Sequence, residues 1–263
     1  MFGTLISKFD ARDYKITVGA QTFPATFELD NLPDVKNQRS ISSCVAHVIA
    51  AIAEYFYYKE HGTKVRMSTD FIYGNQYTLT GRQGKGMYPR DACKILMKYG
   101  DCKWTVLPTN TEMPNCINKI QSLTDDERNG ALEQRIKSYA KCSTDAAMKY
   151  ALTKYGPLLG SISYNDKLAV NDDGVVTNVI RRGNKAHGVM IYGWNDIGWL
   201  CQNSWGTSWG NKGRFIIPFE NEIKECWCFV DMIGNDVKVP KNNYALNKLY
   251  KAYNAVRNTI KKN

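Results

Sequence analysis

The chain has 263 residues, 43% of them hydrophobic and 12% aromatic, which is enough for one large domain or for two lobes that share a cleft. No run approaches the roughly 18 consecutive apolar residues of a transmembrane helix. The formal net charge is +10, and it is unevenly distributed, because residues 239–263 hold six Lys or Arg and no acidic residue.

Cysteine and histidine usage argues against a metal site. The sequence has eight Cys and three His, and its closest cysteine pair, Cys226 and Cys228, is too tight for the usual zinc spacing. We therefore expect no metal and mostly reduced, buried thiols, which are typical of a cytosolic protein. Residues 1–10 lack the basic start and long apolar run of a secretory signal.

The first half of the chain is predicted to be helical. Residues 1–30 are polar and irregular and predict an arm that lies on the body of the protein. From Cys44, apolar residues recur at helical spacing until the helix ends near His61. Ser42 or Ser43 is expected to cap this buried central helix.

Further helices are predicted on either side of a glycine-rich loop at residues 81–86. Ser68 and Thr69 are expected to cap the second helix, and a third helix is expected at Pro89–Tyr99. Residues 103–126 hold two prolines and few periodic apolar positions, so they predict a long connection. Acid-rich residues 125–127 are expected to start a short helix.

The second half of the chain is rich in predicted strands. Ser143 is expected to cap a helix that runs through Lys154. Helices followed by strands predict an α+β protein with two lobes. The strand-like runs are Leu158–Tyr164, Gly174–Val179, Gly188–Tyr192, Trp199–Asn203, Arg214–Pro218 and Phe229–Ile233.

Cys44 is the first candidate for chemistry. A cysteine at the start of a helix lies against the positive end of the helix dipole, which favours the thiolate over the thiol. The thiolate is the nucleophilic form and suits covalent catalysis. The alternative is an inert, buried core cysteine.

His187 is the histidine best placed to serve as a base for such a thiol. His61 is expected at the surface, and His47 is expected to pack in the core. His187 begins an apolar strand, and Asn203 follows it in a segment with two Trp. A catalytic imidazole needs a group that holds its tautomer, and an Asn oxygen can do so. The alternative is an ordinary core strand and turn.

Three blocks together resemble the papain-like cysteine proteases. They are Asn-Gln…Ser-Cys at 37–44, Ala-His-Gly-Val at 186–189, and Asn-Ser-Trp-Gly-Thr-Ser-Trp-Gly at 203–210. The resemblance runs from about Pro33 to Ile217 and is strongest to short microbial and viral members without a long propeptide. It implies a two-lobed α+β fold, with a helical lobe, a strand-rich barrel-like lobe and an active site between them.

The resemblance also implies catalytic roles. Cys44 would be the nucleophile, and His187 would be the general base and then the general acid. Asn203 would orient His187. Gln38 would donate to the oxyanion together with the backbone N–H of Cys44, and such donors stabilise charge that develops in the transition state. No metal and no organic cofactor are implied.

Substrate binding is assigned in the same way. Gly84 and Gly86 would lie where the family binds a substrate backbone in extended form, with Gly86 the closer. Trp205 would shield the His–Asn pair, and Ala186 would line the site next to the histidine. Val45 stands where the family usually has Trp next to the nucleophile, which changes one wall of the site.

The predicted domains are an arm at 1–30, a peptidase domain at 31–237 and a basic amphipathic helix at 238–263. The lobes of the peptidase domain would divide near residue 128. The last helix is expected to pack on the body, or to meet an anionic surface or acidic partner. The sequence has no specific nucleic-acid motif.

Two interpretations of the arm remain open. Residues 1–9 could cross the cleft and inhibit the enzyme, or the arm could only brace the two lobes, as we favour for residues 10–14. The predicted function is a cysteine endopeptidase that acts on polypeptides in the cytoplasm, or in the host cytosol or virion if the chain is viral. The alternatives are a catalytically silent papain-like binding protein and a Cys–His acyltransferase or amidase.

Overall fold

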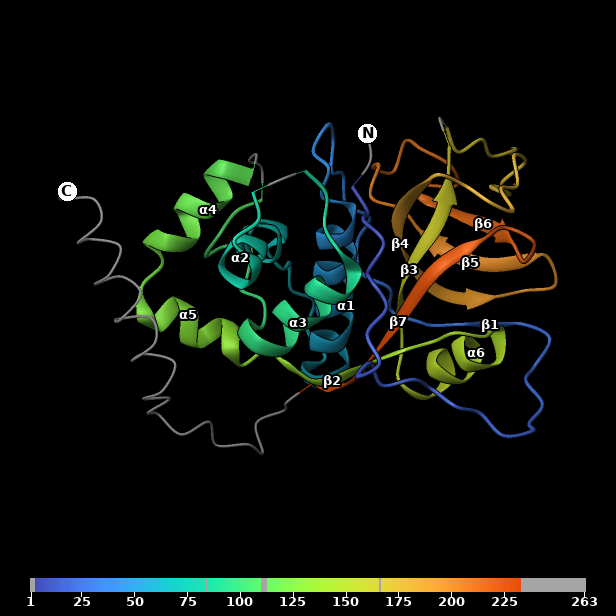
Figure 1. Cartoon of the computed structure of the whole chain (residues 1–263), viewed down its shortest axis with the longest axis horizontal. Coiled ribbons are helices and arrows are strands. Elements are labelled where there is room, and N and C mark those ends of the chain that lie inside the picture. Colours follow the sequence, from blue (N-terminus) through green and yellow to red (C-terminus); the bar gives the residue numbers. More distant parts are fainter. Residues whose placement is uncertain (1–2, 84, 110–112, 166, 233–263) are drawn as a thin grey trace. The chain divides into compact units, whose positions relative to one another are not determined.

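The computed structural model of the chain describes residues 3–83, 85–109, 113–165 and 167–232. Apart from α6 (Asp145–Lys154), which lies with the strands, the helices gather on one side of this part of the chain and most strands on the other (Figure 1). The expected α+β architecture is therefore confirmed. The predicted helix at residues 238–263 lies outside the described residues. Among the described helices, none has the length and apolar character needed to cross a bilayer.

α1 is the central element of the helical lobe. Every residue from Cys44 to Tyr55 is buried, because α1 packs against α2 and α3 on one side and β3 and β4 on the other. A helix buried all round needs apolar residues on every face, as this one has. The helices of the lobe are α1 (Cys44–His61), α2 (Thr69–Thr80), α3 (Pro89–Tyr99), α4 (Met113–Ser122) and α5 (Asp125–Leu132).

The helix caps agree only in part with prediction. The Ser68 side chain accepts from the backbone N–H of Phe71 at the start of α2, as expected. The expected serine cap of α1 was wrong, because Ser43 makes no side-chain capping bond. Its hydroxyl lies 3.2 Å from Nδ1 of His47 instead.

Two other helix predictions were wrong. Residues 103–126 contain α4, whose buried Met113, Cys116, Ile117 and Ile120 recur at helical spacing. Pro114 hid this pattern, although proline is tolerated in the first turn of a helix. The cap of α6 (Asp145–Lys154) is the residue after the predicted Ser143, because Thr144 accepts from the N–H of the third helical residue.

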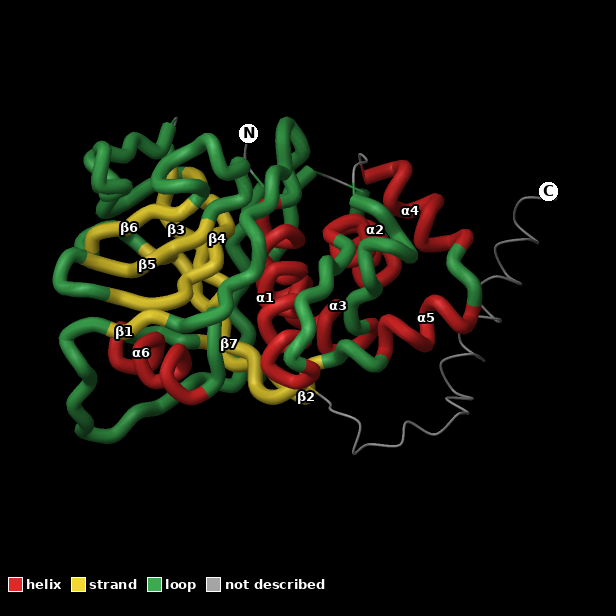
Figure 2. Tube along the Cα trace, turned by 180° about the vertical axis from the view of Figure 1, so that it is seen from behind, coloured by secondary structure: helices red, strands yellow, loops and turns green. Residues whose placement is uncertain are grey.

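The strands form a seven-stranded sheet in which every pairing is antiparallel. Their order is β2-β7-β3-β4-β5-β6, with β1 paired to β4, and α6 packs on the sheet (Figure 2). The strands are β1 (Phe27–Glu28), β2 (Ile136–Lys141), β3 (Leu158–Tyr164), β4 (Lys185–Trp194), β5 (Gly198–Gln202), β6 (Arg214–Pro218) and β7 (Ile223–Met232).

Three strand predictions need correction. Residues 174–179 form no strand, since Val175 and Val176 make only isolated bridges in a loop beside β6. The prediction missed β2, an edge strand whose lysines and serine break the apolar alternation. The predicted strand at 229–233 is the end of the longer β7, and Ile233 lies outside the described residues.

The N-terminal arm passes between α1 and the strands (violet-blue in Figure 1). Asp13 forms a buried ion pair with Arg90 on α3. The next residue, Tyr14, accepts through its carbonyl from the N–H of Lys141 on β2 at 2.7 Å. Asp13 and Tyr14 therefore attach the arm to α3 in the helical lobe and to β2 in the sheet.

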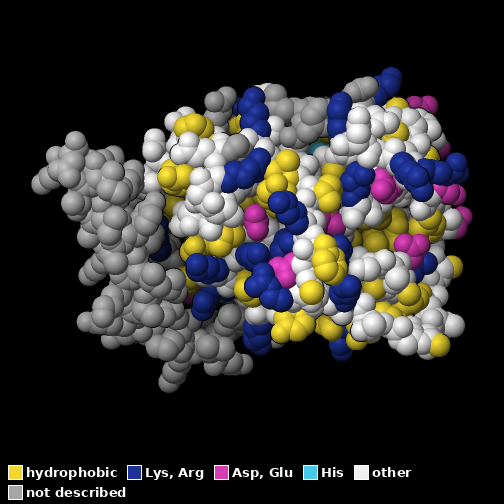
Figure 3. Space-filling view, in the orientation of Figure 1, with side chains coloured by type: hydrophobic (Ala, Val, Ile, Leu, Met, Phe, Trp, Pro, Cys, Tyr) yellow, Lys and Arg dark blue, Asp and Glu magenta, His cyan; other side chains and the backbone are white. Residues whose placement is uncertain are grey.

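Charged side chains are spread over the described surface. On the face in Figure 3, Lys and Arg side chains lie over both lobes with Asp and Glu between them. Within the described residues, no group of three His, Cys, Asp or Glu side chains is arranged to hold a metal ion. On the face in Figure 3, charges of both signs are mixed, so they do not identify a binding surface of one charge.

A buried ion pair attaches the loop before α1 to the helix. Nζ of Lys36 lies 2.5 Å from Oε2 of Glu54, and the two side chains are 10% and 5% exposed. The other oxygen of Glu54 accepts from the N–H of Met67 at 2.8 Å. The loop at residues 33–43 is thus held to α1 by one carboxylate.

We predict that Glu54→Ala lowers the free energy of unfolding by about 3–5 kcal/mol, because it leaves the Lys36 ammonium buried without its partner. Asp30→Ala is the matched control, since its 3.7 Å pair with Lys59 is exposed. That change should cost no more than about 0.5 kcal/mol. Chemical denaturation of both variants checks the prediction, and equal losses would contradict it.

Candidate active site

Cys44 lies at the junction between the loop and α1. It is the first residue of the helix, and its side chain is 0% exposed. The N–H groups of a first helical turn are free of intrahelical partners, so they create a positive potential around the sulfur. The sequence prediction of a thiol at a helix start is confirmed.

His187 and Asn203 come together from neighbouring strands. His187 lies in β4, and Asn203 directly follows β5, which pairs with β4. Nε2 of His187 is 2.7 Å from Oδ1 of Asn203. The same oxygen accepts from the N–H of Ser204 at 2.8 Å. Because a backbone N–H can only donate, Oδ1 is the acceptor, and Nε2 of His187 carries the proton.

That tautomer leaves Nδ1 of His187 for the sulfur of Cys44. Burial alone would raise the pKa of Cys44, but the positive charge of His187 and a hydrogen bond from it oppose burial. The sulfur also lies 3.2 Å from Oγ1 of Thr4 and accepts from the N–H of Gly188 at 3.4 Å. Together these contacts hold the pKa of Cys44 below its ordinary value.

The other buried thiols titrate in the opposite direction. Burial raises the pKa of Cys93, Cys102 and Cys201, which have no imidazole beside them to offset it. All eight cysteines are free and buried. Cys44 therefore differs from these thiols in its electrostatic surroundings and not in its burial.

Trp205 covers the His187–Asn203 contact. Its ring centroid is 4.7 Å from that of the His187 imidazole, with the planes tilted by 31°. Trp209 packs edge-on against Trp205 at 4.9 Å. An apolar cover of this kind excludes water and strengthens the buried hydrogen bond.

Gln38 is held in place by a residue that the sequence interpretation did not single out, Ser204. Oε1 of Gln38 accepts from Oγ of Ser204 at 2.6 Å, and the N–H of Gln38 donates to the Ser204 carbonyl at 2.8 Å. Nε2 of Gln38 donates to the carbonyl of Ile41 at 2.8 Å. Ser204 directly follows Asn203 in the Asn-Ser-Trp-Gly block, and this place in the block is the sequence signal that could have identified it.

The glycine loop meets the N-terminal arm. Gly84 lies outside the described residues. Gly86 has a φ of 79°, and a Cβ there would lie 3.0 Å from the carbonyl oxygen of Gly3. The groups that pair with the arm belong to the next residue, Met87. Ala186 is buried beside His187 in β4.

The N-terminal arm lies directly on the sulfur of Cys44. Besides the Thr4 contact, a Cβ built on Gly3 would lie only 2.5 Å from Sγ. Thr4 forms a parallel bridge with Met87. Both residues were part of the predicted arm, but neither was predicted to touch the thiol.

The two remaining histidines behave as expected. His47 is buried one turn along α1, and burial lowers its pKa to about 4, with a further contribution from Lys36 and Arg66. It is therefore neutral near pH 7 and cannot stabilise a thiolate by charge. His61 is exposed at the end of α1.

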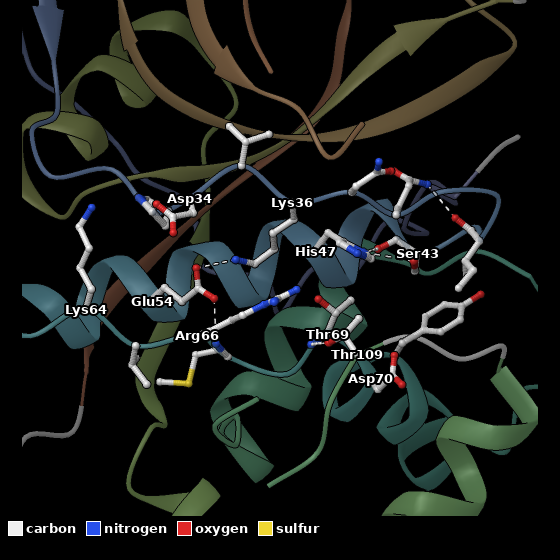
Figure 4. Close-up of a pocket in the computed structure, with 18 of the residues that line it drawn as sticks. Asp34, Lys36, Ser43, His47, Glu54, Lys64, Arg66, Thr69, Asp70 and Thr109 are labelled. Carbon is white, nitrogen blue, oxygen red and sulfur yellow. Dashed lines mark hydrogen bonds and ion pairs between the residues drawn. The ribbon is translucent and has the colours of Figure 1, made fainter. Parts of the chain in front are cut away.

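A cavity of about 590 Å³ is lined by the loop that carries Gln38 and by α1 (Figure 4). Its wall includes Gln38, Lys36, Glu54 and Arg66, but neither Cys44 nor His187. Lys36 is paired with Glu54, and the guanidinium of Arg66 lies 4.7 Å from the Trp104 ring centroid. The cavity thus shares Gln38 with the proposed site and does not include the thiol.

Comparisons with known proteins find similar sequences over most of the chain. The sequence profile described as papain family cysteine protease matches residues 23–232. A cysteine protease of Blomia tropicalis is 25% identical over 201 residues, covering 69% of this chain and 56% of that protein. An uncharacterized peptidase C1-like protein of Acanthamoeba polyphaga mimivirus is 25% identical over 275 residues, covering 86% and 85%. The chain thus spans little more than half of the Blomia protein.

Solved structures show the same fold. Xylellain, a cysteine protease from Xylella fastidiosa, aligns with a TM-score of 0.73 at 21% identity and covers 87% of this chain and 95% of its own. The bromelain protease from Ananas comosus, in complex with the E64 inhibitor, aligns with a TM-score of 0.64 at 18% identity, covering 79% and 99%. These likenesses confirm the papain-like two-lobed fold.

We predict that His187→Ala moves the pH dependence of Cys44 alkylation to higher pH. The variant removes the charge that opposes burial, so the pKa of the thiol should rise. Iodoacetamide labelling across a pH series, with the Cys44 peptide followed by mass spectrometry, measures the shift. His61→Ala is the control and should leave the profile unchanged. An unshifted profile in His187→Ala would contradict the assignment.

Proposed function

The chain belongs to the papain family of cysteine proteases, and we propose that it hydrolyses peptide bonds through an acyl-enzyme formed on Cys44. The observation that supports this most strongly is His187, which acts on the sulfur of Cys44 while Asn203 holds its other nitrogen at 2.7 Å. This is the arrangement of nucleophile, base and orienting group that covalent acyl transfer requires.

In the first half of the proposed reaction, the Cys44 thiolate attacks the substrate carbonyl carbon. The oxyanion accepts hydrogen bonds from the backbone N–H of Cys44 and from Nε2 of Gln38. Protonated His187 then gives its Nδ1 proton to the departing amine as the C–N bond breaks. The product left on the enzyme is a thioester.

In the second half, neutral His187 takes a proton from water, and the resulting hydroxide attacks the thioester carbonyl. The C–S bond breaks, the acid product leaves, and the thiolate–imidazolium pair is restored. Asn203 fixes the tautomer of His187 throughout, and Trp205 keeps water from their hydrogen bond. No step of this cycle needs a group outside the chain except water.

Both ends of the Gln38 side-chain amide are held by hydrogen bonds. Nε2 of Gln38 donates to the Ile41 carbonyl, while Oε1 is held by Ser204. An amide nitrogen has two protons, so one remains for an oxyanion while Ile41 holds the other. Ser204 is therefore a positioning residue, which fixes the amide of Gln38 through Oε1.

The substrate is proposed to be a polypeptide that binds in extended form along the Gly86–Met87 backbone. A silent binding protein is disfavoured because Cys44, His187 and Gln38 are all present. An acyltransferase or amidase would use the same thioester, and product analysis separates it from a protease. A partner for residues 238–263 remains a prediction.

We predict that Cys44→Ala abolishes hydrolysis of a fluorogenic peptide library while leaving the thermal unfolding midpoint close to that of the parent chain. The change removes the nucleophile but only one sulfur atom from the packing. His61→Ala is the matched control and should retain activity. Activity that persists in Cys44→Ala, or acyl products found only on an added amine, would contradict the protease assignment.

We also predict that Gln38→Ala lowers kcat/KM by about 10²-fold, since one oxyanion donor is lost. Ser204→Ala should lower it less, because Gln38 keeps its bond to Ile41. The loss should fall on kcat more than on KM, as expected for an interaction made in the transition state. Steady-state kinetics on one peptide measure kcat and KM separately. A rise in KM with kcat unchanged would exclude an oxyanion role.

A further inference from the structure

Three buried cysteines gather where β2 ends beside β7. Cys142 directly follows β2, and Cys226 and Cys228 flank Trp227 on β7. Because side chains alternate along a strand, Cys226 and Cys228 point to the same face of the sheet. The three cysteines are 4%, 1% and 0% exposed and pack in one hydrophobic core, which is separate from the core that contains Cys44.

The register of the two strands places Cys142 opposite Cys226. Lys141 pairs with Trp227 in the antiparallel ladder, so the next residue, Cys142, faces Cys226. The backbone N–H of Cys142 donates to the Cys226 carbonyl at 2.9 Å, in agreement with this pairing. The Cα atoms of such a pair are about 5.5 Å apart, which lies inside the range of about 4.4–6.8 Å that a disulfide spans.

Cys228 is a second neighbour of Cys142. It pairs with Ala140, two residues before Cys142, so the two cysteines are diagonal neighbours on one face of the strand pair. The thiol of Cys142 forms side-chain hydrogen bonds with both Cys226 and Cys228. Cys142 therefore has two partners within reach, and a disulfide to either one leaves the third thiol free.

The cluster has the geometry of a thiol pair and not that of a metal site. Among the residues that the structure describes, no group of three His, Cys, Asp or Glu side chains is arranged to hold a metal ion. A structural zinc site would take four such ligands. The chemistry that suits these cysteines is therefore the formation of a sulfur–sulfur bond.

A cavity of about 350 Å³ lies beside Cys142. Its wall includes Cys142, Asp145 and Lys224, but neither Cys226 nor Cys228. A space of this size accommodates a small molecule. Cys142 is also the most exposed of the three thiols. A small oxidant that enters the cavity therefore meets Cys142 first, while its two partners stay in the core.

We propose that Cys142 is a redox modification site, at which a small disulfide such as glutathione disulfide oxidises the protein to an intrachain bond between Cys142 and Cys226, with Cys228 as the alternative partner. This inference goes beyond the proposed function and does not depend on it, because it uses no group of the Cys44 site.

The oxidation proceeds by two thiol–disulfide exchanges. The Cys142 thiolate attacks one sulfur of glutathione disulfide, the S–S bond breaks, and one glutathione leaves as its thiolate. The Cys226 thiolate then attacks the Cys142 sulfur of the mixed disulfide and releases the second glutathione. Two protein thiols are oxidised, one small disulfide is reduced to two thiols, and the two protein protons end on the two glutathione molecules.

The cluster is a slow target for this oxidation. The hydrogen bond with Cys226, together with burial, raises the pKa of Cys142. The hydrogen bond with Cys142, together with burial, raises the pKa of Cys228. Little thiolate is therefore present near neutral pH, and the thiolate is the reacting form. The extent of oxidation is best measured at equilibrium in a glutathione buffer and not as an initial rate.

The bond would fix the strand that connects the two lobes. β2 packs against α3 of the helical lobe and pairs with β7 of the sheet. A disulfide at its end would close a long loop of the unfolded chain, which disfavours unfolding. The oxidised protein is therefore expected to be more stable than the reduced protein.

Disulfide mapping of the full chain tests the site. The protein is equilibrated with glutathione disulfide, the remaining thiols are blocked with iodoacetamide under denaturing conditions, and unreduced peptides are mapped by mass spectrometry. We expect a loss of two hydrogens and a peptide that links Cys142 to Cys226 or Cys228. Cys201, which is 0% exposed and donates to the Trp199 carbonyl, should stay reduced. An unlinked Cys142, or a glutathione adduct there that no protein thiol displaces, would overturn the proposal.

Serine variants identify the partners. Cys142→Ser should abolish the link, and Cys226→Ser should move it to Cys228, because Cys142 contacts both thiols. Cys201→Ser is the matched control and should leave the link unchanged. A link between Cys226 and Cys228 that forms equally well in Cys142→Ser would overturn the role of Cys142. The map of the parent chain decides the proposal even if a variant fails to fold.

Thermal unfolding tests the consequence of the bond. Oxidation should raise the unfolding midpoint of the parent chain by about 5 °C or more, and dithiothreitol should reverse the shift. The midpoint of Cys142→Ser should not respond to oxidation. Equal midpoints for the oxidised and reduced parent would contradict the attachment of β2 to β7. Peptide hydrolysis is not measured here, so failure of this proposal leaves the proposed function untouched.

Discussion

The charge of His187 against the sulfur of Cys44 is the interaction on which the rest of the site depends. Burial ordinarily keeps a thiol protonated, and it raises the pKa of Cys93 and Cys201. At Cys44 the charge of His187, a hydrogen bond from it and the Gly188 N–H oppose burial. The proposed nucleophile therefore depends on both lobes, because α1 carries the thiol and β4 carries His187.

Much of the fold holds α1 and β4 in this arrangement. α1 carries the thiol and is buried along most of its length, so its position is fixed by packing on both sides. The Lys36–Glu54 pair fixes the loop that carries Gln38, and Ser204 fixes its amide. The block of sequence that positions His187 through Asn203 thus also positions Gln38, the proposed oxyanion donor, through Ser204.

The sequence predicted which residues meet at the thiol better than it predicted the elements around them. Cys44, His187 and Asn203 could be found because the proposed reaction demands particular residue types, whereas the helix at Met113–Ser122 was hidden by a proline and β2 by its polar edge residues. The contact of Thr4 with the thiol could not be predicted, since Gly3 and Thr4 carry no motif. Only the folded path of the arm, fixed by Met87, Arg90 and Glu225, brings them to the site.

Acid-quenched mass spectrometry can detect the acyl intermediate that Cys44 should form under the influence of His187. A peptide ester is mixed with the full chain, the reaction is stopped in acid within the first turnover, and the labelled peptide is mapped. We expect one acyl group on Cys44 that disappears on further incubation before quenching. Turnover without any acylated Cys44, or an acyl group on a different residue, would contradict the proposed mechanism.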